Sequence, residues 1–217
     1  MQKINSFWGL FCCIGALMLA SGCIEISEEV TVNENGSGNI RLSVDMGALA
    51  ASLNTGNTTM NVSILEEIKK IVAEAPTRLE KCKGIHTIKA GSNEKKGTYA
   101  VSFDFDNSKA LNEALLLLAG AKKGTPAPKF YKITAHKFIR KDLSPYVQRL
   151  MKKQNQGSAN EMFYSYITLK STFAFPKAVK KSSNIRSEIN NSNTVISKFT
   201  LDEMIKGIYN TGHKITY

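Results

Sequence analysis

Short runs in which apolar and polar residues alternate recur along this chain, with turn-forming residues between them. The first two are IEISEEVTV at 24–32 and NIRLSVDM at 39–46, separated by NENGSG. Successive side chains of a β-strand point to opposite faces, so each run has one apolar face, and Asn, Gly and Ser favour the turn. Residues 24–46 are therefore predicted to form a β-hairpin. Glu28 interrupts the apolar series and is predicted to mark a strand edge or a bulge.

Other segments show the same kind of pattern. A second hairpin is predicted from 84–90 and 98–106, with the residues from Tyr99 to Phe105 alternating inward, and a third is predicted around a turn at Asn190–Asn193. Single strands are predicted at 129–141, with a helix as the alternative, at 162–175 before Pro176, and at 213–217.

Two segments have helical periodicity instead. Ser63 followed by Glu66 has the spacing of a capping box, an apolar stripe follows it, and Pro76 is predicted to end that helix. The second helix is predicted at 109–121, capped by one of the polar residues 106–108.

Shorter helical segments are predicted at 47–54 and from Pro145, the latter followed by a polar loop to residue 160. Strands in hairpins with few helices indicate an α+β fold. We expect an antiparallel sheet built from β-hairpins, with about two main helices packed on one face. Residues 23–217 are expected to form a single domain, because that length can enclose one substantial core.

The first residues of the chain have the pattern of a secretory signal. Lys3 precedes an apolar run at 7–20, and small residues then lead to Cys23. The run is shorter than the roughly 20 apolar residues that a spanning helix needs, and acidic residues follow it instead of a basic cluster. Residues 1–22 are therefore predicted to be a signal peptide that is removed on export.

A cysteine directly after Ala-Ser-Gly resembles the bacterial lipoprotein signal, in which the thiol receives a diacylglycerol before cleavage. The resemblance implies that Cys23 is the lipidation site, although Leu19 lies one place earlier than the favoured position. Two acyl chains, each contributing about 0.8 kcal/mol per buried CH₂, would hold the chain on a bacterial membrane, at its periplasmic or surface face. A plain signal peptide with an incidental cysteine is the alternative.

The net charge of +11 is concentrated in the second half of the chain. Residues 23–120 contain 10 Lys and Arg against 13 Asp and Glu, whereas residues 121–217 contain 18 against 5. In an exported protein this asymmetry favours an anionic envelope lipid or glycan, or another envelope protein, as the partner. A merely solvated surface is the alternative. Because the lysines are scattered in the sequence, nucleic acid is not expected as a partner.

The residues that could bind metal or catalyse a reaction are few: His86, His136, His213, Cys82, Asp104 and Asp106. The histidines have no metal-ligand spacing, and the thiol is predicted to be an apolar-leaning residue at a strand entrance. The two aspartates share an open sheet face, where nothing separates their pKa values. Nucleotide-binding glycine loops and a nucleophile elbow are absent from the sequence. No catalytic, cofactor-binding or metal-binding residue is therefore predicted.

Three stretches together resemble the LppM-like class of small, uncharacterised bacterial lipoproteins. They are the hairpin directly after Cys23, the strand-to-helix junction FDFDNSKALNEAL at 103–115, and FAFPKAVKKSSN with the following TVISKFTL at 173–201. The resemblance implies an envelope-anchored α+β domain and names no ligand.

These observations favour a lipid-anchored envelope protein that acts as a non-enzymatic binding or assembly module, without a cofactor. The alternative is an envelope hydrolase with an unrecognised site, which would need a concave pocket with converging His, Asp or Glu side chains. Because a strand begins directly after Cys23, the domain is expected to lie close to the membrane.

Overall fold

The computed structural model describes residues 24–47, 62–122, 124–126, 128–153 and 164–217. The predicted signal peptide, Cys23, the predicted helical turn after Gly47 and the predicted loop from residue 154 lie outside these residues. Within the described part of the chain, no helix is both long enough and apolar enough to cross a membrane.

Seven strands form the larger of two sheets, and they contain the three predicted hairpins. In chain order they are β1 (Ile24–Val32), β2 (Gly38–Asp45), β3 (Ile85–Asn93), β4 (Thr98–Phe105), β7 (Ile167–Ala174), β9 (Ser187–Asn190) and β10 (Thr194–Thr200). Their order in the sheet is β3-β4-β2-β1-β7-β10-β9. Every pairing is antiparallel except that of β1 with β7, which is parallel. The hairpins are therefore confirmed, and a parallel contact joins the two halves of the chain.

A second sheet has four short strands: β5 (Tyr131–Thr134), β6 (Lys137–Arg140), β8 (Lys181–Ser182) and β11 (His213–Thr216). Their order is β5-β6-β11-β8. The segment predicted as one strand at 129–141 is thus a hairpin, and the predicted terminal strand is confirmed. The expectation of a single sheet was wrong, because residues distant in the sequence assemble a second layer.

Four helices occur among the described residues: α3 (Val62–Leu79), α4 (Ser108–Leu118), α5 (Ser144–Lys153) and α7 (Leu201–Lys206). The side chain of Asn107 caps α4 by accepting hydrogen bonds from the backbone N–H groups of Lys109 and Ala110. A capping box formed by Thr200 and Glu203 begins α7, which the sequence interpretation had missed. Mixed helix and strand content is confirmed: α3 and α4 are the two main helices expected, α5 is the short helix predicted from Pro145, and α7 was not predicted.

The helix α3 continues through Pro76, so the prediction that this proline ends it was wrong. A proline inside a helix costs about 3 kcal/mol because its N–H is missing and its ring crowds the preceding turn. The flanking Ala75 and Leu79 are both fully buried in the core. Packing of this last turn outweighs the local preference of proline.

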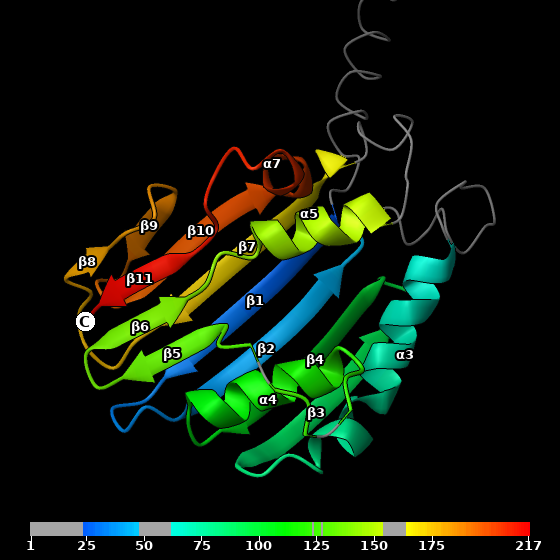
Figure 1. Cartoon of the computed structure of the whole chain (residues 1–217), viewed down its shortest axis with the longest axis horizontal. Coiled ribbons are helices and arrows are strands. Elements are labelled where there is room, and N and C mark those ends of the chain that lie inside the picture. Colours follow the sequence, from blue (N-terminus) through cyan, green and yellow to red (C-terminus); the bar gives the residue numbers. More distant parts are fainter. Residues whose placement is uncertain (1–23, 48–61, 123, 127, 154–163) are drawn as a thin grey trace, which may run out of the picture.

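The helices α3 and α4 and the smaller sheet lie over the same face of the larger sheet, which we call the inner face (Figure 1). One hydrophobic core extends beneath both coverings. Phe138 of the smaller sheet packs against Phe173 of β7 at a ring-centroid distance of 4.7 Å. Phe103, on the other half of the sheet, is fully buried in the same core. The smaller sheet therefore covers half of the inner face.

Glu28 does not mark an edge or a bulge, which corrects the prediction made from the sequence. The strand β1 is the central strand of seven, and its register with both neighbours is continuous through Glu28. The Glu28 side chain points to the inner face, where it forms an ion pair with Arg140 of the smaller sheet.

Candidate functional site

A row of polar side chains crosses the inner face beneath the smaller sheet. Cross-strand pairing aligns Glu28 of β1 with Ser171 of β7, Ser171 with Ser197 of β10, and Ser197 with Ser187 of β9. Arg140 and His213 are paired neighbours on β6 and β11 of the smaller sheet, and both contact this row. We call these six residues the polar seam.

Arg140 and Glu28 form an ion pair at one end of the polar seam. The Arg140 Nη2 donates to Glu28 Oε2 at 2.9 Å, and the Ser171 hydroxyl donates to the same oxygen at 2.8 Å. Only 4 % of the Arg140 side chain and 14 % of the Glu28 side chain are exposed. Removing one partner of such a pair leaves an uncompensated charge, so the two residues depend on each other.

His213 occupies the middle of the polar seam, where it joins the two sheets. Its Nε2 lies 3.0 Å from Ser197 Oγ and its Nδ1 lies 3.3 Å from Ser187 Oγ. Burial, together with the nearby Arg140 charge, lowers the pKa of His213 to about 3. The imidazole is therefore neutral at physiological pH.

A serine beside a histidine is also what a hydrolase needs, but this pair is poorly suited to catalysis. Ser197 is only 2 % exposed, so a substrate has no direct approach to its hydroxyl. An imidazole with a pKa near 3 is a weak general base at neutral pH. The arrangement holds the two layers together.

An apolar groove lies next to the polar seam, on the inner face toward the start of β1. The cross-strand row Tyr99, Val44, Ile26 and Leu169 supplies its floor, and Ile68 and Ile71 of α3 supply one wall. We call this the inner groove. Its volume is about 340 Å³, at the lower end of the roughly 300–1,000 Å³ typical of ligand sites.

Ile26 shows that the inner groove is open. It has the inward direction of its strand, yet 38 % of its surface is exposed. Glu28, two residues further along β1, lines the groove together with Arg140. The groove thus has apolar walls and a single ion pair at one end, which suits a ligand with a long apolar part and one polar group.

The exposed face of the smaller sheet gathers lysines that are far apart in the sequence. Lys132 and Lys214 flank Ile139 in one cross-strand row, and Lys137 and Lys181 flank Thr216 in the next. None of these four lysines forms an ion pair with another described residue. We call this surface the lysine face.

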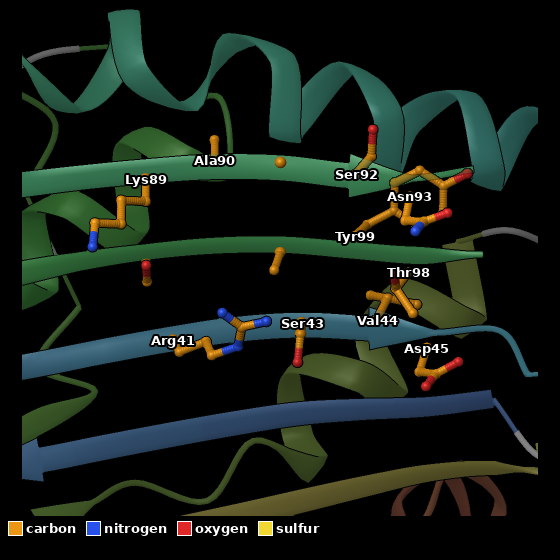
Figure 2. A pocket seen from close by; sticks show the side chains of 13 residues that line it. Arg41, Ser43, Val44, Asp45, Lys89, Ala90, Ser92, Asn93, Thr98 and Tyr99 are labelled. Atoms are coloured by element: carbon orange, nitrogen blue, oxygen red, sulfur yellow. The ribbon is translucent and has the colours of Figure 1, made fainter. Parts of the chain in front are cut away.

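The opposite face of the larger sheet carries a shallow polar hollow of about 510 Å³ (Figure 2). Arg41 of β2 and Lys89 of β3 lie on the two strands that flank β4, and both pair in register with Ser102. Their charges are exposed to solvent, where a single ionic contact contributes little. This hollow is a weaker candidate than the inner groove.

Of the chemically capable residues considered in the sequence, His86 and Asp106 come into contact, at 3.1 Å on the surface. Cys82 is buried, which agrees with its predicted apolar character. Hydrogen bonds from Thr87 and Asn39 lower the pKa of Asp104, opposite to what a general acid needs. Among the described residues, no group of three or more His, Cys, Asp or Glu side chains could hold a metal ion.

Sequence reasoning missed Glu28 and Arg140 as partners, although a signal was present. Glu28 points to the same side of β1 as the apolar residues of that strand. Arg140 pairs with Tyr131 across the β5–β6 hairpin, so it points to the same side as Tyr131 and Ile133. A charged residue at an inward position requires a partner when it is buried. The complementary partner lies 112 residues away and could not be chosen from local pattern.

Comparison with solved structures gives a distant likeness. No family model matches the chain. No curated protein matches it either. The NMR structure of the folded domain of the LppM protein of Mycobacterium tuberculosis is similar over 90 % of each chain, with a TM-score of 0.44 and 10 % sequence identity. This likeness concerns the fold alone.

Proposed function

We propose that this chain is a lipid-anchored protein of a bacterial envelope that binds the apolar chain of an envelope lipid in the inner groove without catalysing a reaction. The open groove carries the proposal: Ile26 is an exposed apolar side chain on the face of the sheet that packs the core. Burying apolar surface there yields about 25 cal/mol per Å². A lipid chain is the apolar ligand that a membrane-tethered domain meets most often.

The anchor part of the proposal rests on the sequence at Cys23. Mass spectrometry of the mature protein tests it directly. We expect an N-terminal Cys23 that carries a diacylglycerol. An unmodified N-terminus, or one generated at another position, would contradict the lipid anchor.

Binding in the inner groove can be measured with N-phenyl-1-naphthylamine, an uncharged probe whose fluorescence rises in apolar sites. The chain from residue 24 contains every described element and avoids the apolar leader. We expect the substitution Ile26→Asp to weaken probe binding at least about tenfold, because it places a charge against the apolar walls. Long-chain lipids should displace the probe from the unchanged protein.

Ile189→Asp is the matched control, because Ile189 is an exposed isoleucine on β9 of the same sheet, away from the groove. This control should bind the probe as the unchanged protein does. Equal loss in both variants, or no loss with Ile26→Asp, would contradict binding in the inner groove.

The lysine face supports a second part of the proposal, in which an anionic envelope surface is the partner of the domain. Each lysine near an anionic membrane contributes about 1 kcal/mol, and the attraction acts within a Debye length of about 8 Å. Four unpaired lysines on one sheet face are suited to this contact. The domain would then rest on the membrane through its smaller sheet.

Sedimentation with vesicles tests this contact. We expect the chain from residue 24 to bind phosphatidylglycerol-containing vesicles and not pure phosphatidylcholine vesicles, with binding lost as salt is raised. Lys132→Glu with Lys214→Glu should weaken binding at least about tenfold. Lys95→Glu with Lys109→Glu changes the net charge equally on exposed positions elsewhere and should have a much smaller effect. Equal effects would show that only net charge matters.

A further inference from the structure

The ion pair that borders the inner groove restricts the polar group a ligand can place there. Glu28 and Arg140 both line the groove, and their charges cancel. The third charged residue along the lining, Lys170, pairs with Glu25 at 3.8 Å on the opposite face of the sheet. The groove therefore offers no uncompensated cation to an anionic head group.

The hydrogen bonds of the pair leave one acceptor available to a ligand. Glu28 Oε2 accepts from both Arg140 and Ser171, whereas Glu28 Oε1 accepts no hydrogen bond from the described residues. The Arg140 Nε has no hydrogen-bond partner and less than 1 Å² exposed. An atom enclosed to that degree is out of reach of a ligand oxygen, which is the size of a water molecule, so the group that the pair offers to a ligand is the Glu28 Oε1 acceptor.

A hydroxyl group suits this acceptor, since it can donate to Glu28 Oε1. A carboxylate does not, because it has no proton to donate and would lie beside the Glu28 carboxylate. In a partly desolvated site, like charges at this range repel strongly.

We propose that the inner groove selects an apolar chain that ends in an uncharged, hydroxyl-bearing head group, such as a monoacylglycerol, over the anion of a fatty acid. Glu28 sets this selectivity, and the apolar walls supply the affinity. The inference rests on the proposed function, because it names the class of lipid that the same groove takes.

Native mass spectrometry of the mature, full-length protein released from detergent micelles tests the selectivity. Equimolar 1-monolauroylglycerol and laurate compete at pH 8, and the ratio of the two bound masses is read directly. We expect the unchanged protein to prefer monolauroylglycerol at least about tenfold. With Glu28→Gln, which has the same shape without the charge, Arg140 becomes uncompensated and the preference should fall at least about tenfold or reverse.

Glu29→Gln is the matched control, because Glu29 is the next residue on β1 and is exposed on the other face of the sheet. This variant should keep the preference of the unchanged protein. If Glu28→Gln does not fold, the ratio measured with the unchanged protein still decides the proposal.

The outcomes separate this inference from the proposed function. Equal binding of the two ligands by the unchanged protein would overturn the selectivity and leave lipid binding intact. Binding of neither ligand would overturn both. A preference that Glu28→Gln does not change would overturn the role of Glu28.

Discussion

The two halves of the inner face use the same sheet in different ways. Beneath the smaller sheet, polar and aromatic side chains are enclosed, and Arg140 and His213 hold the two layers together. Toward the start of β1, α3 covers the sheet only partly, and apolar side chains border an open groove. Charge and polarity are concentrated in the half that the smaller sheet closes. In the other half the open groove is apolar, so its surface is available to a ligand without breaking hydrogen bonds.

The closed half should show the largest effects on stability. Phe138 is fully buried and contacts the rings of Tyr131, Phe173 and Phe175. We expect Phe138→Ala to lower the free energy of unfolding by about 3–5 kcal/mol, because the cavity lies where two layers meet. Urea denaturation measures this loss. A loss below about 1 kcal/mol would mean that the smaller sheet does not seal the core.

The ion pair should be the next most sensitive feature. Arg140→Met is expected to cost about 3 kcal/mol in urea denaturation, because it leaves Glu28 without its cation. Adding Glu28→Gln to that variant should recover part of the loss. Arg41→Met, on the exposed outer face, is the control and should change stability by less than about 0.5 kcal/mol. Similar costs for both single variants would contradict the assigned role of the pair.

His213 should make the closed half sensitive to acid. Its pKa in the folded protein is about 3, below the value of about 6.5 expected after unfolding. Between these values the unfolded chain binds more protons, so stability falls as pH decreases from about 6.5, by about 1.4 kcal/mol per pH unit. Above pH 6.5 this contribution to stability is complete.

Comparing pH profiles of unfolding isolates the effect of His213 from that of the carboxylates. The profile of His213→Asn should be flatter between pH 4 and 6.5 than that of the unchanged protein. His136→Asn, which alters an exposed histidine on the neighbouring turn, should keep the original slope. Parallel profiles for all three proteins would contradict the low pKa.

Substitution of Ile26 in the open groove should have the smallest effect on the free energy of unfolding. Ile26 and Ile40 lie on adjacent strands of the same face, but Ile40 is fully buried. Ile40→Ala is expected to cost about 2–5 kcal/mol, whereas Ile26→Ala should cost less than about 1 kcal/mol. Urea denaturation of the two variants checks the difference. Equal costs would mean that the groove is closed in solution.

The local parts of the fold could be predicted because their signals are local. Alternation and turn residues within about 25 positions specify the hairpins, and the polar residues at 106–108 predicted the cap of α4. The parallel pairing of β1 with β7 has no such signal, because it depends on which distant strands bury each other. The same limit hid the second sheet.

The candidate site was less predictable than the fold. Glu28 was noticed as an exception in an apolar series, but the alternation alone could not distinguish a bulge from a charge with a buried partner. Pro76 shows the converse, since a strong local signal was overridden by the packing of Ala75 and Leu79. The inner groove exists only where non-adjacent elements leave a space, so no single segment encodes it.

The central position of β1 also has a consequence for the order in which the fold can be completed. When the chain is synthesised or exported from its N-terminus, the hairpin of β1 and β2 is the first described part to emerge. The other edge of β1 needs β7, and so its backbone groups stay unpaired until residues 167–174 have followed. Until then the molecule presents a strand edge that can pair with a neighbouring chain. The strand at the middle of the finished sheet, β1, is thus exposed along one edge to pairing with other chains until β7 has been made.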